Sequence, residues 1–378
     1  TPCHVLDLAR LEQNLALLRR VADAAGVEIL LALKAFSCFA VADLVSRYLN
    51  GTAASGLHEA RLGKTRFGGE VHAYVPGLKE GEIDEILTYA DHLIFNSLGQ
   101  WRRFGPRLEQ ADATGFGLRI NPGHKEVENP LYDPCAPWSR LGLPAAELIP
   151  EDLEGLEGLH VHALCDHPYA AFDRMLDAVE RNCSHLFGNM QIKWINLGGG
   201  LLITEDGFPV DALIDRLKAF RERTGLKVYL EPGTAVALHA GALVSEVLDC
   251  MENVGSIAIM DTSATCHMPD VIEAPFTPEV LGAQALPRDR APAKNEPQIV
   301  RLGGPTCLAG DIIGTYRFDT PPKVGDRLVF LDLAYYTMVK QTTFNGTPLP
   351  ALALWDSRTD ALEVVREFSY GDFEGRLS

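Results

Sequence analysis

Short apolar runs alternate with amphipathic stretches between residue 28 and about residue 233. The apolar runs predict eight strands, at 28–34, 51–55, 71–75, 92–96, 115–121, 158–164, 193–199 and 227–233. Between them, apolar residues at three- and four-residue spacing predict helices, at 41–49, 57–67, 80–90, 169–182 and 209–224. This alternation is typical of α/β proteins with a parallel sheet, and eight strands predict a closed, TIM-like (β/α)8 barrel.

After about residue 240 the pattern changes to strand-like runs without helices between them. These runs lie at 241–249, 256–261, 297–304 and 326–332, and a similar run lies at 3–8. We therefore predict a barrel over 21–240 and a second, mainly β C-terminal domain over 241–378. Residues 1–20 are expected to contribute a strand to the β domain. The segment 274–297 is rich in proline, alanine and charge, and we expect a mobile loop there.

Polar residues and glycines follow the predicted strands at the ends where such barrels hold their active sites. Lys34 ends the first strand, in "LLALKAFS", and Glu231 ends the eighth. Further such residues are Ser55, Asn96, Arg119, Asn121, His162, Cys165 and the run 198–200. Packing alone does not explain this distribution, so we expect these residues to form a site.

Lys34 taken alone is an ordinary strand-end lysine that reaches water. Its neighbours favour another interpretation, because "LGGG" (197–200) and "EPGTA" (231–235) place glycine turns at adjacent strand ends, where backbone N–H groups can bind a phosphate. An imine-forming lysine, a phosphate-binding turn and a carboxylate able to pair with a pyridinium nitrogen together indicate pyridoxal 5'-phosphate (PLP). His162 is expected to stack on the flat cofactor.

A metal site is the competing interpretation of "HVHALCDH" (160–167). His160, His162, Cys165 and His167 are possible ligands, but their spacing matches no standard zinc pattern. We expect no metal ion there.

The composition limits the kinds of binding partner and the cellular location that we expect for this protein. The formal net charge of -17 argues against nucleic acid and suits a cationic small-molecule substrate. Eight cysteines without CxxC spacing fit reduced thiols, and neither a signal peptide nor an apolar run of about 18 residues is evident. We expect a cytoplasmic protein that binds no membrane.

Several motifs resemble those of the fold type III PLP-dependent decarboxylases, the ornithine and diaminopimelate decarboxylase group. They are "LALKAFS", "HVHALCD", "LGGG", "EPGTA", "GGPTCLAGD" (303–311) and "DLAYYTMVKQTTFNG" (332–346), in matching order over nearly the whole chain. Within this group, "LHEARLG" (57–63), "DPCAPWSRLG" (133–142), "CHMPDVIEAPF" (266–276) and the form "GPTCLAGD" resemble the carboxynorspermidine/carboxyspermidine decarboxylases.

The resemblance implies an alanine racemase-like barrel and specific roles. Lys34 would bind PLP covalently, His162 would stack on its ring and Glu231 would pair with its ring nitrogen. The phosphate would be held by Gly199, Gly200, Gly233, Thr234 and Tyr336. Cys307 would be the general acid, and the substrate contacts would be Asp311, Asp270, Glu273 and Arg140. The family's active sites lie at a homodimer interface, so Cys307 and Asp311 would come from the second subunit.

The implied substrates are carboxynorspermidine and carboxyspermidine, which one methylene distinguishes, so the sequence does not rank them. Leu308 stands where the ornithine enzymes carry an acidic residue, which disfavours a simple diamine amino acid. The alternatives are decarboxylation of diaminopimelate, ornithine or arginine, and a non-catalytic PLP-binding regulatory homologue. Retention of both Lys34 and Cys307 argues against the last.

Overall fold

The computed structural model describes residues 1–108, 115–188 and 191–378, and it divides into two compact units. One unit comprises Glu12–Val236, and the other comprises Thr1–Leu11 together with Ala237–Ser378. The boundaries between the two units therefore follow Leu11 and Val236. The sequence predicted these boundaries after residues 20 and 240. Each unit contains its own sheet.

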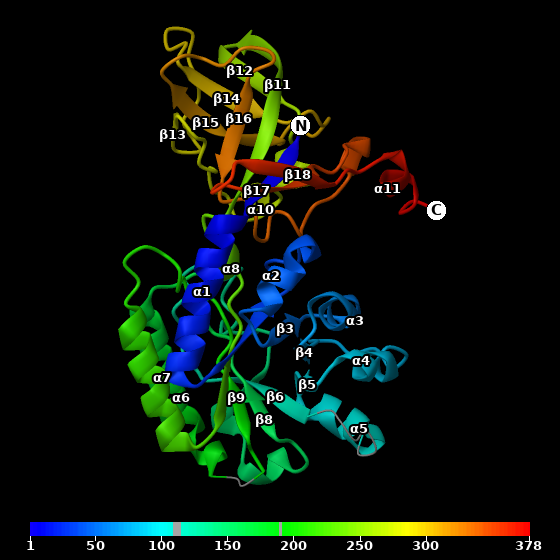
Figure 1. The fold of residues 1–378 in the computed structure, drawn as a ribbon, viewed down its shortest axis with the longest axis vertical. Coiled ribbons are helices and arrows are strands. Elements are labelled where there is room, and N and C mark those ends of the chain that lie inside the picture. The colour runs from blue at the N-terminus through cyan, green and yellow to red at the C-terminus, as the bar shows by residue number, and fades with distance from the viewer. Residues whose placement is uncertain (109–114, 189–190) are drawn as a thin grey trace. The chain divides into compact units, whose positions relative to one another are not determined.

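The unit Glu12–Val236 is built around a closed ring of parallel strands (Figure 1). The strands are β2 (Glu28–Ala32), β3 (Gly51–Ala54), β4 (Glu70–Tyr74), β5 (His92–Phe95), β6 (Gly115–Asn121), β8 (Gly158–His160), β9 (Trp194–Asn196) and β10 (Lys227–Leu230). They pair in this order, and β10 returns to β2. The short strand β7 (Leu143–Pro144) pairs in parallel with the last two residues of β6. The predicted (β/α)8 barrel is therefore confirmed.

Helices lie between the barrel strands and cover them. They are α1 (Leu8–Ala25), α2 (Ala42–Ser46), α3 (Leu57–Leu62), α4 (Ile83–Tyr89), α5 (Leu98–Leu108), α6 (Tyr169–Phe187), α7 (Val210–Thr224) and α8 (Thr234–Ala237), with the shorter turns η1 (Phe39–Val41), η2 (Gly63–Phe67), η3 (Ala145–Glu147) and η4 (Pro150–Leu153). Helix α6 shows why they form, because Phe172, Leu176, Val179 and Cys183 recur at three- and four-residue spacing and are buried.

The barrel interior alternates between apolar and polar layers. Trp194 and Tyr229 belong to a buried apolar cluster inside it. Glycine makes room for the indole ring, because a Cβ at Gly158 would lie 1.9 Å from Trp194 and one at Gly117 would lie 2.5 Å from it.

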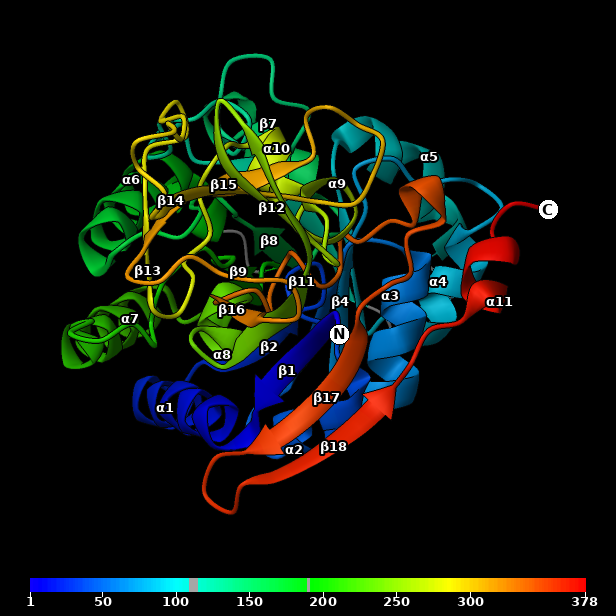
Figure 2. The same cartoon turned by 90° about the horizontal axis from the view of Figure 1, so that it is seen from above.

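The second unit is a mainly antiparallel sheet. Its strands are β1 (Cys3–Asp7), β11 (Gly241–Asn253), β12 (Gly255–Met260), β13 (Ala283–Ala285), β14 (Ile299–Gly303), β15 (Ile312–Phe318), β16 (Arg327–Leu331), β17 (Ala351–Asp356) and β18 (Ala361–Arg366). Its short helices are α9 (Ala264–His267), α10 (Asp270–Glu273), η5 (Phe344–Gly346) and α11 (Tyr370–Glu374). Figure 2 shows β1, β17 and β18 side by side, and β1 also pairs with β11.

Two local predictions are corrected. The N-terminal strand ends at Asp7, and helix α1 occupies the rest of the segment 1–20, since its apolar residues recur at helical spacing. The segment 274–297, predicted as a loop, contains strand β13, which pairs with the edge of β15. No helix among the described residues is long and apolar enough to span a bilayer.

Candidate active site

A pocket lies where the barrel strands end on their carboxyl side. Its lining includes Lys34, His162 and Glu231, three of the residues that the sequence selected. The other lining residues are Ala32, Ala53, Ala54, Ser55, His72, Tyr74, Arg119 and His160. The structure therefore brings together residues that lie up to about two hundred positions apart in the chain.

Lys34 follows strand β2 by two residues, and its Nζ lies 3.4 Å from Nε2 of His162. Solvent reaches the side chain through the pocket, yet protein atoms surround the ammonium group on most sides. This desolvation lowers the pKa of Lys34, an effect that Arg119 reinforces and that the negative charge of Glu231 opposes. A lowered pKa increases the fraction of neutral amine, which is the form that attacks a carbonyl group.

His162 is oriented by a backbone hydrogen bond. Its Nδ1 accepts the N–H of Gly199 at 3.1 Å, so the proton of the neutral ring resides on Nε2, which faces Lys34. Burial, followed by the nearby charges of Lys34 and Arg119, holds the pKa of His162 well below its usual value. The imidazole is therefore neutral near pH 7 and presents a flat, uncharged face.

Glu231 is held as a carboxylate by two partners. Asn196 Nδ2 donates to Oε1 at 2.6 Å, and Nε2 of His160 lies 3.2 Å from Oε2. Burial alone would raise the pKa of Glu231, but His160, followed by His72 and Lys34, lowers it, and the pKa falls to about 2. Burial also lowers the pKa of His160, which favours a neutral imidazole that donates Nε2–H. The pocket thus contains a carboxylate that is negatively charged near pH 7.

The glycine turns bring loop backbones very close together. A Cβ at Gly199 would lie 2.1 Å from the carbonyl oxygen of Glu231, and one at Gly233 would lie 2.4 Å from Cβ of Ala35. Gly200 has a φ of 81°, a left-handed conformation that favours glycine. Thr234 begins α8 and is buried. These four residues occur together at the strand ends, as the sequence predicted, and Gly199 also orients His162.

Arg119 and Tyr74 complete the pocket. The Arg119 guanidinium lies 4.5 Å from the centre of the Tyr74 ring and donates to the carbonyl oxygen of His162 at 3.2 Å. The exposed Arg140 lies near enough for its charge to counteract the burial that raises the pKa of Tyr74. Its carbonyl oxygen accepts a hydrogen bond from Asn96.

The remaining predicted residues belong to the β unit. The Cys307 thiol is exposed, so it is not a buried core cysteine, and its N–H donates to Asn345 at 2.9 Å. Tyr336 is half-buried, and its carbonyl oxygen accepts the N–H groups of Val339 and Lys340.

Asp311 is only 3% exposed, and its carboxylate accepts four hydrogen bonds. The donors are the Ser263 hydroxyl (2.8 Å), the Thr306 hydroxyl (2.6 Å) and the N–H groups of Thr265 (3.1 Å) and Thr306 (3.3 Å). Thr306 directly precedes Cys307, so Asp311 fixes the backbone beside the thiol.

Asp270 and Glu273, both on α10, accept hydrogen bonds from the same ammonium group, that of Lys340. These partners raise the pKa of Lys340, although burial opposes the rise. The two carboxylates therefore already surround one alkylammonium group.

Sequence reasoning missed the functional positions of His160, Asn196 and Tyr74. His160 was considered only as a metal ligand, but it pairs with Glu231, and His167 Nδ1 accepts the N–H of Cys165 instead. The available signal was the two-residue period of the strands, which directs His160 and His162, or His72 and Tyr74, to one face.

The site residues fit PLP. Lys34 would hold the cofactor covalently, Glu231 would face its cationic ring nitrogen, and the glycine turns at the neighbouring strand ends would lie beside its phosphate. Bound PLP supplies an electron sink for the bond broken at the substrate α-carbon.

Comparison with known proteins agrees with this fit. The family model described as pyridoxal-dependent decarboxylase, C-terminal sheet domain, matches residues 6–334. The chain belongs to this family of PLP-dependent decarboxylases.

Curated relatives match the whole length of this chain. A carboxynorspermidine/carboxyspermidine decarboxylase of Campylobacter jejuni is 42% identical over 100% of this chain and 98% of its own. A carboxyaminopropylagmatine decarboxylase of Synechocystis is also 42% identical, over 100% of this chain and 95% of its own. The crystal structure of C. jejuni carboxynorspermidine decarboxylase with norspermidine has a TM-score of 0.89 at 41% identity, and it covers 100% of this chain and 99% of that chain.

Proposed function

We propose that this protein is a carboxy-lyase that decarboxylates carboxynorspermidine, carboxyspermidine or both, in polyamine biosynthesis. The observation that carries the chemistry is the grouping of Lys34, His162 and Glu231 in one barrel pocket. Full-length similarity at 42% identity to the C. jejuni enzyme supports the choice of substrate.

The pocket residues divide the work among them. Lys34 would hold the cofactor, the neutral His162 would lie against its ring, and Glu231 would keep the ring nitrogen protonated through its negative charge. The substrate loses CO2 from its α-carbon, and Cys307 then donates a proton to that carbon. The net change replaces the carboxylate by hydrogen, and the thiolate left on Cys307 recovers a proton from solvent.

The cationic tail of the substrate needs carboxylates, and Asp270 and Glu273 are our candidates. Their contact with the Lys340 ammonium supports this role, because that group has the same chemistry as the amines of a polyamine. The exposed Leu308 adds no charge beside the thiol. We assign Arg140 to the substrate carboxylate, as a guanidinium near the pocket tyrosine Tyr74.

Asp311 is better suited to holding the Cys307 loop than to binding an amine. Its carboxylate already accepts hydrogen bonds from Ser263, Thr265 and Thr306, and it is buried within the β unit. We therefore propose that Asp311 acts on the reaction through the position of Cys307.

A second substrate is favoured by a specific observation. The Synechocystis carboxyaminopropylagmatine decarboxylase is as similar to this chain as the C. jejuni enzyme. Its substrate has a guanidinium at the end of the tail, which paired carboxylates such as Asp270 and Glu273 can also bind.

We further propose a homodimer whose active sites combine Lys34 of one subunit with Cys307 of the other, and Tyr336 would complete the phosphate contacts. The motifs that place this chain among the fold type III enzymes support this assembly. The cysteines of the chain, all free, suit the reducing cytoplasm as its location.

The test is a panel assay of CO2 release with added PLP. The substrates are carboxynorspermidine, carboxyspermidine, carboxyaminopropylagmatine, diaminopimelate, ornithine and arginine. We expect kcat/KM to be highest for one of the first two. Highest activity on carboxyaminopropylagmatine would establish the second candidate, whereas release from diaminopimelate, ornithine or arginine alone, or none at all, would refute both.

A further inference from the structure

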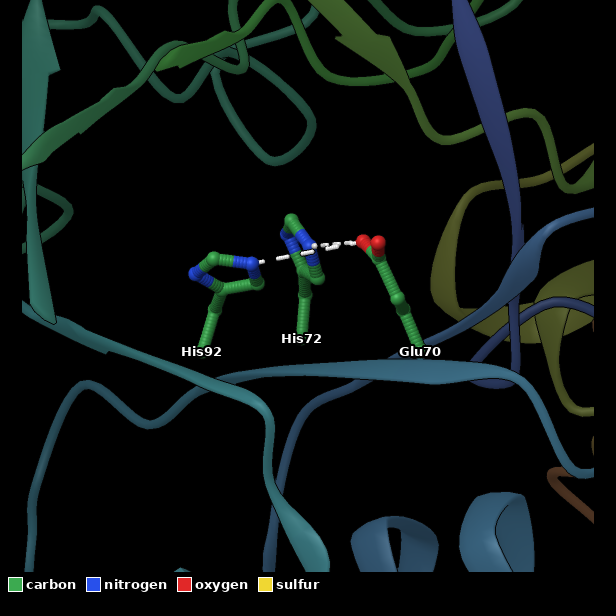
Figure 3. Close-up of side chains that lie close together, drawn as sticks. All are labelled: Glu70, His72 and His92. Carbon is green, nitrogen blue, oxygen red and sulfur yellow. Dashed lines mark ion pairs between the residues drawn. The ribbon is translucent and has the colours of Figure 1, made fainter. Parts of the chain in front are cut away.

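A second group of polar side chains lies toward the amino-terminal ends of the barrel strands, where Glu70 begins β4 and His92 begins β5. His72, in the middle of β4, belongs to this group and also lines the pocket that contains Lys34 and Glu231. Glu70 and His72 belong to β4 and His92 to β5 (Figure 3). Nε2 of His72 lies 3.5 Å from Oε2 of Glu70, and Nε2 of His92 lies 4.0 Å from the same oxygen. One potential ligand atom from each residue lies within 4.8 Å of the other two.

The histidines are buried with unused hydrogen-bonding capacity. His72 is 1% exposed, and neither of its ring nitrogens has a hydrogen-bond partner among the described residues. The same holds for Nδ1 of His92, whose ring centre is 4.3 Å from that of His72. Unsatisfied buried nitrogens are costly, and a cation bound at Nε2 of His72 would satisfy one of them.

The carboxylate of Glu70 is already ionised and fixed. Tyr229 donates to its Oε2 at 2.8 Å, and Lys227 donates to its Oε1 at 3.1 Å. Hydrogen bonds of this kind orient carboxylates that bind metals, and the second lone pair of Oε2 remains available beside the Tyr229 hydroxyl.

We propose that Glu70, His72 and His92 bind a divalent transition metal ion of the zinc class. Two imidazoles and one carboxylate are a donor set that zinc accepts, with bonds of about 2.0–2.2 Å. Tetrahedral bonds of that length place neighbouring ligand atoms roughly 3.3–3.5 Å apart, close to the observed 3.5 Å and within a small side-chain rotation of 4.0 Å. Three protein ligands leave one position for water.

The position of the cluster makes the ion structural. Chemistry in such barrels takes place at the carboxyl ends of the strands, whereas the opposite end contributes to stability. An ion held between β4 and β5 would fasten these neighbouring strands and stabilise the folded protein by mass action. Decarboxylation would proceed without it.

The experiment uses the full-length holoenzyme, dialysed against a chelator and then titrated with ZnCl2 or MgCl2 in a calorimeter. We expect one zinc ion per chain, no comparable binding of magnesium, and a higher melting temperature with zinc. His92→Ala and Glu70→Gln should each weaken zinc binding at least tenfold, in line with the loss of a ligand. The exposed His58 lies outside the cluster, and His58→Ala is the matched control that should leave zinc binding unchanged.

The Co2+-substituted protein gives an independent signal. Wild-type protein should show the visible absorption of four-coordinate Co2+, and His92→Asn, a smaller change than alanine, should abolish it. PLP absorbance and circular dichroism verify that each variant is folded. Absence of one-to-one zinc binding, or binding that persists undiminished in folded His92→Asn and Glu70→Gln proteins, would overturn the proposal and assign any zinc to adventitious thiol sites.

Discussion

Nε2 of His160 lies 3.2 Å from Oε2 of Glu231, and both residues line the pocket that contains Lys34. This contact opposes the effect of burial and keeps the pKa of Glu231 near 2. The charge that the cofactor requires therefore depends on a histidine that need not touch the cofactor.

Replacement of His160 tests this dependence. His160→Phe removes a hydrogen bond to a buried carboxylate worth about 1.5–3 kcal/mol, so the pKa of Glu231 should rise by roughly 1–2 units. The acidic limb of the kcat profile should move to higher pH by a similar amount. Tyr74→Phe in the same pocket is the control, and equal shifts in both variants would contradict the assignment.

The free energy of unfolding should also depend on the ionisation of Glu231. Its pKa is lowered from its usual 4.5 to about 2, so the unfolded chain binds more protons there between these pH values. The stabilising contribution is complete above pH 4.5 and is lost as pH falls through 2. It amounts to roughly 3 kcal/mol, at about 1.4 kcal/mol per pKa unit.

The free-energy difference between wild type and Glu231→Gln should therefore shrink as pH falls through this window. Urea unfolding at a series of pH values measures it. Tyr74→Phe is the control, because it changes the same pocket without removing a group that titrates between pH 2 and 4.5. A difference between wild type and Glu231→Gln that is independent of pH would exclude this role.

Cys307→Ala should slow decarboxylation by about 10²–10⁴-fold, the usual contribution of a positioned proton donor, or yield a misprotonated product. Rates come from CO2 release, and products are identified by mass spectrometry. Cys250 is another exposed cysteine of the β unit, so Cys250→Ala should retain wild-type activity. An unchanged rate and product in Cys307→Ala would remove the thiol from the mechanism.

Subunit mixing tests the shared active site. Lys34→Ala should abolish both activity and the absorption of covalently held PLP. Mixed with inactive Cys307→Ala, it should regain roughly a quarter of wild-type activity, because half of the random dimers are mixed and each has one intact site. Lys34→Ala mixed with a double variant lacking both side chains should stay inactive. Failure to recover activity in verified mixed dimers would place both residues in one subunit.

Asp311→Asn separates positioning from substrate binding. The new amide group would face the donors of Thr306 and Ser263, so we expect a loss of about 1–3 kcal/mol in unfolding free energy. The kcat should fall more than KM changes, because the Cys307 loop loses its support. A large increase in KM with unchanged melting temperature would instead favour direct contact with the substrate amine.

The barrel could be predicted because its strands are short, apolar and regularly spaced, and because the site lies at their ends. Helix α5 escaped prediction since Gly99, Gly105 and Pro106 weaken its helical signal. Strands β17 and β18 were missed because their alternation is interrupted and β18 is largely exposed.

The site was only partly predictable for a related reason. The sequence shows which residues lie at the end of a strand, but it does not show which residue forms a hydrogen bond with a buried carboxylate. The pairing of His160 with Glu231 spans 71 positions, and the burial of Asp311 depends on Ser263, 48 positions away. Polar residues at the amino-terminal ends of the strands, such as His92, carry no comparable signal in the sequence, because the active sites of such barrels lie at the carboxyl ends.

Lys340, seated between Asp270 and Glu273, is tethered to the same polypeptide as the carboxylates it neutralises. For a polyamine tail bound at these carboxylates, Lys340 is an intramolecular competitor whose effective concentration is fixed by the loop that carries it. Each binding event would exchange one ammonium for another, and each release would let the lysine return. Because of this exchange, the two carboxylates would always have a positive charge beside them. It would also speed release of the polyamine product and lower the affinity for it.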